Sequence, residues 1–237
     1  MFLDYSCSNS TCNLPTINKE DYSRAQQFSY RGKGYSTFVH GIGISINNYN
    51  ELPSLKESIR QSLQIPPNAK VFLSVGELND NKNQITAIQA FMDANLKDSY
   101  YLLCGDGANR NKIEKLLKKN NNNKIKLLGY RSDIPQIIKE CDYFIFPSYR
   151  EGLSAALMEA MVGGLPCIVS RIRGNTDLLG EEYPYYFQPN DAKMLAQEIN
   201  AIINDDRDWK RYVAEKVKPF SFECVVDELQ NIYRSIK

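Results

Sequence analysis

The feature that most constrains the fold is an alternation of apolar runs and helix-period segments, repeated six times between residues 70 and 203. The apolar runs, each predicted as a strand, are KVFLSVG (70–76), YYLLCG (100–105), KIKLLG (124–129), YFIFPS (143–148), PCIVS (166–170) and YYF (185–187). The helix-period segments are 84–94, 111–119, 134–140, 154–162, 175–179 and 192–203. Apolar strands that alternate with helices are typical of a parallel sheet covered on both faces. The sequence therefore predicts an α/β, Rossmann-like, doubly wound parallel sheet.

The residues outside this segment predict less regular structure. Residues 1–20 are polar and are expected to be irregular, followed by a short helix over 21–28, a turn at 31–34 and a strand over 37–44. These first 50 residues are too few to form a domain of their own. Two further helices are predicted at about 207–217 and 222–235.

Length and charge exclude several classes of protein. The chain has 237 residues, of which 43% are hydrophobic and 24% charged, enough for a sizeable core. A net charge of +1 disfavours a nucleic-acid partner. The six cysteines form no C-x-x-C pair and His40, interpreted as structural, is the one histidine, which disfavours a zinc site.

The cysteines and the apolar runs also predict a location. Scattered thiols without a disulfide framework fit a reducing compartment. The first residues lack the basic and apolar regions of a signal peptide, and no apolar run reaches the ~18 residues that a membrane span needs. The sequence therefore predicts a cytoplasmic protein.

Ligands of doubly wound sheets bind beyond the carboxyl ends of the strands. The segment PSYREGLSAALMEAMVGG (147–164) lies at such an end, with a helix predicted to begin near Ser154. The first amides of that helix, from Leu153 to Ala156, have no partners within the helix, and Gly152 lets a ligand approach the backbone. Together these residues predict an anion cradle suited to a diphosphate.

Two acidic residues, Glu151 and Glu159, flank this cradle. A carboxylate beside a phosphate is unfavourable unless it accepts hydrogen bonds from hydroxyls, and a vicinal diol offers two. A sugar nucleotide carries diols on both sides of its diphosphate. The alternative is that Glu151 is a cap and Glu159 a solvated helix residue, although Leu157 stands where a capping box needs Glu or Gln. From the residues alone, both interpretations stay open.

The spacing of Glu151, seven residues and Glu159 resembles the E-x7-E signature of family 4 glycosyltransferases. Further motifs of that family recur in order, namely SVGELNDNKN (74–83), LLCGDG (102–107), LLGYRSDIP (127–135) and RGNTDLL (173–179). The resemblance covers residues 70 to about 205 and is greatest to bacterial polysaccharide-biosynthesis members. It implies a GT-B fold, in which two Rossmann-like domains face a cleft and the C-terminal domain binds the donor.

The resemblance also implies a domain organisation. Residues 1–47 would be a remnant of the N-terminal domain with the segment that hands over to the second domain. Residues 48–220 would be the donor-binding domain, and residues 221–237 a helix that crosses back. The N-terminal domain, with the acceptor site, would then be largely absent.

The family roles carry over residue by residue. The resemblance implies that Glu151 binds hydroxyls of the donor sugar, that Lys82 neutralises the leaving phosphate and that Glu159 binds the ribose. The amides of Leu153 and Ser154 would hold the diphosphate. No metal and no cofactor besides the nucleotide-diphosphate sugar is implied. The alternative for Lys82 is a solvated loop lysine.

Four further positions are weaker candidates. Many members of the family carry a phosphate-binding Arg where Glu77 stands, and Arg173 is the candidate replacement, with an exposed loop arginine as the alternative. Tyr130 and Arg131 are placed to stack on or edge the base, although Tyr130 is also compatible with simple packing. Gly105 belongs to a GDG turn that is weak as a nucleotide motif by itself.

The function implied is transfer of a sugar from a nucleotide-diphosphate sugar to a saccharide or lipid-linked acceptor, with retention. The alternative is a non-catalytic nucleotide-sugar binding module, truncated or split, that needs a separate acceptor-domain chain. A GT-B epimerase is disfavoured by the E-x7-E setting. The basic stretch 110–126 favours a solvated amphipathic helix over attraction to a membrane surface, so membrane contact would be at most peripheral, at the inner face.

Overall fold

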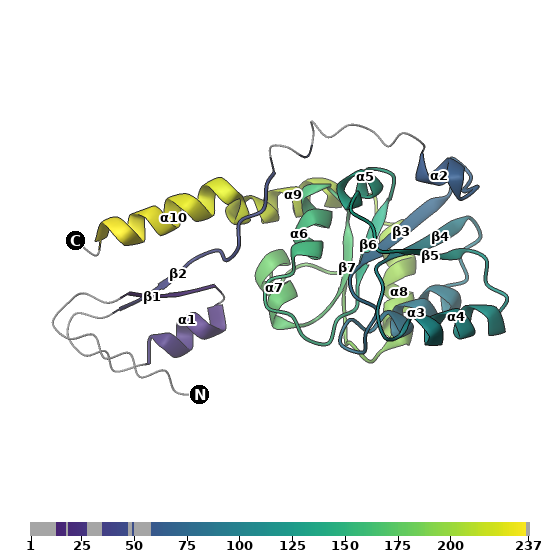
Figure 1. Ribbon diagram of the computed structural model, residues 1–237, viewed down its shortest axis with the longest axis horizontal. Coiled ribbons are helices and arrows are strands. Elements are labelled where there is room, and N and C mark those ends of the chain that lie inside the picture. Colours follow the sequence, from purple (N-terminus) through teal and green to yellow (C-terminus); the bar gives the residue numbers. More distant parts are fainter. Residues whose placement is uncertain (1–12, 18, 28–34, 47–48, 50–57, 236–237) are drawn as a thin grey trace. The chain divides into compact units, whose positions relative to one another are not determined.

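The computed structural model describes residues 13–17, 19–27, 35–46, 49 and 58–235. The chain divides into two units (Figure 1), Met1–Ile46 with Lys218–Lys237 as unit 1 and Asn47–Val217 as unit 2. The interpretation of residues 1–47 as a remnant of another domain stays a prediction.

Unit 2 is built on one parallel sheet of six strands in the order β5-β4-β3-β6-β7-β8. The strands are β3 (Lys70–Val75), β4 (Ser99–Cys104), β5 (Ile125–Gly129), β6 (Tyr143–Phe146), β7 (Cys167–Ser170) and β8 (Tyr186–Phe187). This order confirms the predicted Rossmann-like fold. Chain order reverses between β3 and β6, which makes their carboxyl ends the switch point of the sheet.

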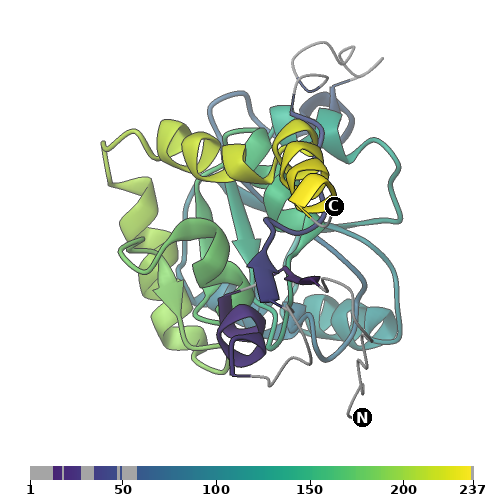
Figure 2. The ribbon, with the colours of Figure 1, turned by 90° about the vertical axis from the view of Figure 1, so that its left-hand side faces the viewer.

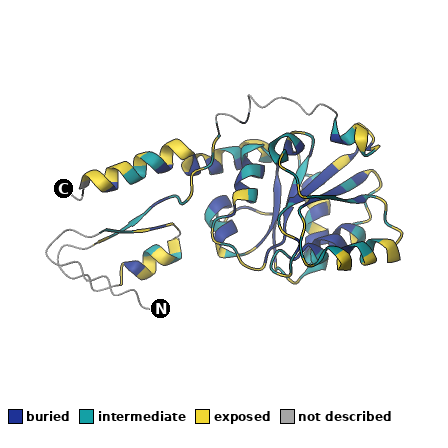
Figure 3. Cartoon of the chain, viewed as in Figure 1, coloured by how far each residue is buried: buried dark blue, intermediate teal, exposed yellow. Residues whose placement is uncertain are grey.

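Two layers of helices cover the sheet (Figures 1 and 2). The helices of unit 2 are α2 (Ile59–Ser62), α3 (Gln84–Asp93), α4 (Arg110–Lys119), α5 (Ile134–Lys139), α6 (Ala155–Val162), α7 (Arg173–Leu179), α8 (Ala192–Ile203) and α9 (Trp209–Val217). Helix α3 packs on α8, whereas α6 packs on α5 and α9. The central strands are buried and the helices turn their polar sides outward (Figure 3). Helix α2 was not predicted, because four residues carry no recognisable period.

The strands β3 and β6 pair over a short distance. Their backbone register joins only Phe72 to Tyr143 and Leu73 to Phe144. Beyond that point the hydroxyl of Ser74 donates to the carbonyl of Ile145 at 2.5 Å. Near the carboxyl ends of the two strands a side-chain hydrogen bond therefore replaces the backbone hydrogen bonds. The loops that follow β3 and β6 begin at the switch point.

Unit 1 contains a second, two-stranded parallel sheet of β1 (Asn13–Thr16) and β2 (Tyr35–Phe38), with α1 (Lys19–Ala25) against it. The prediction of irregular structure over residues 1–20 was therefore wrong for β1. Its four residues are too few for an alternation pattern, and pairing with β2 decides their conformation. The helix predicted at 21–28 begins earlier, at Lys19, and the strand predicted at 37–44 ends at Phe38. The turn predicted at 31–34 lies outside the described residues.

The C-terminal helix α10 (Phe222–Ser235) completes unit 1, preceded by the 3-10 turn η2 (Lys218–Phe220). Val225 and Ile232 of this helix are buried against Val39. The imidazole Nδ1 of His40 lies 2.6 Å from a carboxylate oxygen of Glu228, and the His40 amide donates to the other oxygen at 2.9 Å. His40 thus links the segment after β2 to α10. This contact is in line with its interpretation as a structural residue.

The described helices include none that is both long and apolar enough to span a bilayer. Within the same described ranges, no three His, Cys, Asp or Glu residues are grouped so that they could hold a metal ion.

Candidate active site

Two loops meet at the switch point, one after β3 (76–83) and one after β6 (147–154). The amide of Tyr149 donates to the carbonyl of Asn81 at 2.8 Å, and the Asn81 side chain donates to the carbonyl of Arg150 at 3.0 Å. Asn83, in the left-handed conformation with φ 54°, donates to the carbonyl of Pro147 at 3.2 Å. These contacts hold the two loops in one arrangement although they are far apart in sequence.

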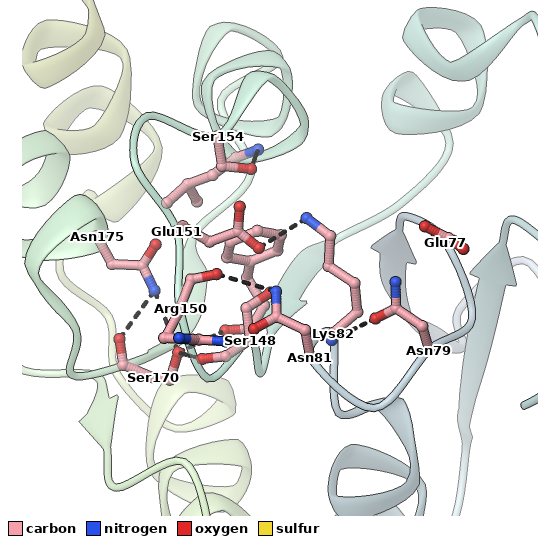
Figure 4. Close-up of polar contacts among 12 residues, drawn as sticks. Glu77, Asn79, Asn81, Lys82, Ser148, Arg150, Glu151, Ser154, Ser170 and Asn175 are labelled. Atoms are coloured by element: carbon pink, nitrogen blue, oxygen red, sulfur yellow. Dashed lines mark hydrogen bonds and ion pairs between the residues drawn. The ribbon is translucent and has the colours of Figure 1, made fainter. Parts of the chain in front are cut away.

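Lys82 and Glu151 face each other across this junction (Figure 4). The Lys82 ammonium lies 2.7 Å from a carboxylate oxygen of Glu151, with the side chains 24% and 13% exposed. The Asn79 side chain accepts the backbone amide of Lys82 at 2.9 Å, and the Phe146 ring lies 5.3 Å from the ammonium. Because both side chains are largely withdrawn from water, each charge depends on the other for compensation. The structure thus brings together the two residues predicted as catalytic.

Helix α6 begins at Ala155, four residues after Glu151. The Ser154 hydroxyl caps it by accepting the amide of Leu157 at 3.4 Å. Helix geometry leaves the N–H groups of Ala155 and Ala156 without an acceptor inside the helix. Glu151 is therefore in contact with the Lys82 ammonium and is followed directly in the chain by the start of α6, the positive end of the helix dipole. A cation and a helix N-terminus are both favourable for a negatively charged ligand.

A buried hydrogen-bond network supports the loop from behind. The Ser170 hydroxyl donates to the carbonyl of Ser148 at 2.6 Å, and the Asn175 amide donates to the carbonyl of Ser170 at 2.8 Å. Gly174 packs so closely that a Cβ there would lie 1.8 Å from the carbonyl oxygen of Gly152. Sequence reasoning missed this support. Polar residues that directly follow buried strands, such as Ser148 and Ser170, were the available signal.

Glu159 lies in the second turn of α6. It shares a face with Ala155 one turn earlier, and helical side chains lean toward the N-terminus, so its carboxylate is directed toward the start of the helix. Burial raises the pKa of Glu159 above its usual 4.5. No residue in the described ranges donates a hydrogen bond to this carboxylate. Its partial burial therefore costs stability that the domain does not recover internally.

The remaining predicted residues lie around this centre. Gly105 has φ +143°, and a Cβ there would lie 1.9 Å from the Gly76 carbonyl oxygen, so only glycine fits. Tyr130, after β5, is 83% exposed. The Arg131 guanidinium donates to both oxygens of Asp133 at 2.8 and 2.6 Å, so its charge is already engaged. Arg173 is the first residue of α7, next to Gly174.

Glu77 is exposed and lies apart from the Lys82–Glu151 pair (Figure 4). Its backbone carbonyl accepts the Gln84 amide at 2.8 Å. A carboxylate repels a phosphate, so Glu77 does not supply the second cation that many family members carry at this position. The roles of Arg173, Tyr130, Arg131 and Gly105 toward a ligand stay predictions.

Substitution of Gly152 distinguishes two reasons for a glycine here, namely packing within the protein and access of a ligand to the backbone. A Cβ at Gly152 would meet no atom within 4 Å, so we expect Gly152→Ala to change the free energy of unfolding by less than about 0.5 kcal/mol. If a diphosphate lies against this backbone, the same methyl group should weaken its binding about tenfold. Urea unfolding and calorimetric titration with a nucleoside diphosphate measure the two effects. Unchanged affinity for that ligand in this variant would remove the backbone of Gly152 from the binding surface.

A doubly wound sheet whose switch point carries a cation, a carboxylate and a helix start has the arrangement that favours phosphate-bearing ligands. Residues 56–218 match the family described as glycosyl transferases group 1. The chain belongs to this family.

Known proteins of this type cover most of the chain. It is 34% identical over 192 residues to a UDP-Gal:alpha-D-GlcNAc-diphosphoundecaprenol alpha-1,3-galactosyltransferase of Escherichia coli, covering 76% of this chain and 48% of the relative. It is 24% identical over 208 residues to N,N'-diacetylbacillosaminyl-diphospho-undecaprenol alpha-1,3-N-acetylgalactosaminyltransferase of Campylobacter jejuni, covering 82% and 55%. The chain thus spans about half the length of the curated relatives it matches.

Solved structures share the fold. A glycosyltransferase from Rickettsia africae superposes with a TM-score of 0.81 at 18% identity, covering 95% of this chain and 63% of that one. Anabaena Alr3699/HepE in complex with UDP and glucose superposes with a TM-score of 0.76 at 22% identity, covering 93% and 62%. The predicted family and fold are confirmed.

Proposed function

We propose that unit 2 binds a nucleotide-diphosphate sugar at the switch point, as the donor site of a glycosyltransferase. The 2.7 Å contact between Lys82 and Glu151, next to the start of α6, carries this proposal. The diphosphate would lie on the amides at Leu153–Ala156 and on Lys82, the sugar hydroxyls on Glu151 and the ribose on Glu159. UDP is the first nucleotide to test, because it appears with the Anabaena protein and in the name of the Escherichia coli relative.

The reaction proposed breaks the bond between the anomeric carbon of the sugar and the diphosphate. Negative charge accumulates on the departing phosphate oxygen as this bond lengthens. A fixed cation and oriented amides stabilise that charge more in the transition state than in the ground state. The acceptor hydroxyl oxygen then forms the new bond to the anomeric carbon with retention, and its proton passes to the departing phosphate oxygen. The acceptor is a saccharide or a lipid-linked saccharide, as in the names of the two relatives.

The carboxylate of Glu151 needs compensation beside a diphosphate. In the structure Lys82 supplies it, so the pair as a whole presents no net negative charge to the ligand. A hydroxyl of the sugar can then approach the Glu151 oxygens as a donor. This is why the two residues are proposed to act together.

Calorimetric titration of the folded chain tests the donor site. We expect heat on addition of UDP, with competition by a UDP-sugar, and weaker heat with uridine. No binding of UDP, GDP or ADP by a chain that is folded by circular dichroism would overturn the proposal. The absence of a metal requirement stays a prediction, and unchanged UDP binding in the presence of EDTA would support it.

Glu159→Gln should separate stability from binding. Because burial raises the pKa of Glu159, its ionised form destabilises the folded state at neutral pH. The penalty is absent only well below pH 4.5, where the carboxyl is protonated in both states, and it is fully present above the raised pKa. We therefore expect the variant to be more stable at pH 7 by a few tenths to about 1 kcal/mol and to bind UDP about tenfold more weakly. Thermal unfolding at pH 7 and at about pH 3.5, with titration at pH 7, would show both effects.

Glu198→Gln is the control for this variant, because burial also raises the pKa of Glu198, which lies on α8. It should show the same kind of stability gain at pH 7 and leave the affinity for UDP unchanged. Equal UDP affinity in Glu159→Gln and the native chain would remove Glu159 from the donor site.

Two interpretations of the sequence stay predictions. The first is the alternative function, a non-catalytic or split-enzyme module, which co-purification with a separate acceptor-binding chain would support. The second is the location of the protein in the cytoplasm.

A further inference from the structure

Helix α4 presents four lysines on one face. Lys112, Lys115, Lys118 and Lys119 are all exposed, whereas Ile113 is fully buried against the sheet. At 100° per residue the four lysines fall within an arc of about 120°, on the side opposite Ile113. They are defined here as the α4 basic face. Helix α4 lies at the outer side of unit 2 (Figure 1), and Figure 3 shows exposed residues along it.

The charge of this face is not compensated by the residues around it. Arg110, at the start of α4, forms the ion pairs of this region, because its guanidinium lies 3.0 Å from a carboxylate oxygen of Asp106 and 3.0 Å from one of Glu114. The four lysines of the α4 basic face form no ion pair with any residue in the described ranges. Glu114, the one acid within the helix, is thus already engaged by Arg110.

Charge is also segregated along the chain. Residues 110–126 contain seven basic residues and one acidic residue, a surplus of six positive charges. The whole chain has a surplus of one, so the other residues together carry five net negative charges. A near-neutral protein therefore concentrates its positive charge on one helix and the strand that follows.

The lysines that follow α4 are less accessible than the α4 basic face. The Lys124 ammonium donates to the carbonyl of Leu96 at 3.0 Å and to that of Lys97, so its charge is held against the backbone. Lys126 lies on β5, the edge strand of the sheet, and is partly buried. The exposed positive charge of this region is therefore concentrated on α4.

The sequence alone favours a solvated helix here, but the structure adds that these lysines gather on one exposed face while Arg110 takes the neighbouring acids. We propose that the α4 basic face docks on an anionic lipid surface. Lysine ammonium groups are hydrated point charges, suited to a fluid array of phosphates rather than to one fixed ligand. The α4 sequence, RNKIEKLLKK, has no aromatic residue to stack on bases, which disfavours single-stranded nucleic acid. The choice of lipid rests on the proposed function, since a lipid-linked acceptor requires the enzyme to work at a membrane.

Vesicle flotation tests the proposal. The chain should bind vesicles of phosphatidylcholine with phosphatidylglycerol (3:1) at about 50 mM NaCl, and release at about 500 mM because salt screens the attraction. Vesicles of phosphatidylcholine alone should not retain it. Replacing the four lysines together (K112Q, K115Q, K118Q and K119Q) should lower the partition coefficient by at least about twentyfold. A lysine in full contact with the surface contributes roughly fivefold, and the expected value is set lower because the four lysines do not all contact the surface at once.

A control with the same change in net charge removes four exposed basic residues elsewhere in unit 2 (K70Q, K193Q, K210Q and R211Q). It should lose less than threefold. Equal losses in both variants, or no binding by the native chain, would overturn the proposal, as would tighter binding to a 20-nucleotide RNA that the α4 variant alone loses. UDP titration of both variants should match the native chain, so failure of membrane docking is distinguishable from failure of the donor site.

Discussion

Replacing Lys82 with methionine is expected to lower the affinity for UDP by about 10- to 100-fold while leaving the affinity for uridine unchanged. Lys82 is held 2.7 Å from Glu151 at the start of α6, and a charge-assisted contact to phosphate contributes about 1.5–3 kcal/mol. Uridine has no phosphate, so it does not depend on this cation. Calorimetric titration with the two ligands measures the difference.

The same substitution leaves the carboxylate of Glu151, 13% exposed, without its partner, which should also lower the free energy of unfolding by about 1–2 kcal/mol. The double variant Lys82→Met with Glu151→Gln removes that unpaired charge and should recover most of the stability but none of the UDP affinity. Lys193→Met, at an exposed position, is the matched control for charge. If the single variant binds UDP and uridine with equal losses, Lys82 does not contact the diphosphate.

Gly174→Ala is expected to lower the free energy of unfolding by about 2–4 kcal/mol. Its Cβ would lie 1.8 Å from the Gly152 carbonyl oxygen and 2.8 Å from that of Glu151, both backbone atoms that cannot rotate away. Either α7 or the loop that carries Glu151 must move, and overpacking of this kind costs about 1–3 kcal/mol or more. Because the displaced loop holds Glu151, UDP affinity should fall as well.

Gly152→Ala is the control, since the same methyl group at the other side of this contact meets no atom within 4 Å. Urea unfolding followed by circular dichroism compares the two variants. A Gly174→Ala variant as stable as the Gly152→Ala variant would show that α7 and the loop do not approach as closely as the structure describes.

Most of the sheet could be predicted from the sequence because its strands are short, mainly apolar runs that alternate with helix-period segments. The strand predicted at 70–76 is β3 (Lys70–Val75), and the helix predicted at 192–203 is α8 with the same bounds. Elements without such a pattern were missed. Strand β1 and helix α2 have four residues each, and their conformation depends on contacts with segments elsewhere in the chain.

The candidate site divides in the same way. Lys82 and Glu151 were predicted from motifs, and the structure brings them into contact. The residues that hold them there, among them Asn81, Asn83 and Asn175, were not predicted as part of the site. An asparagine in a loop is equally common in turns, and only its partners show that it joins two loops.

Burial period and motif spacing are local properties, so the doubly wound sheet and the acids and lysine that follow its strands could be predicted from the residues alone. The folded chain was needed to show that Lys82 pairs with Glu151 across the switch point, that Gly174 packs α7 against the loop and that the lysines of α4 have no acidic partner in the described residues. These depend on which strands lie side by side. Strand order is set by the packing of the whole sheet, and no short segment of sequence carries it.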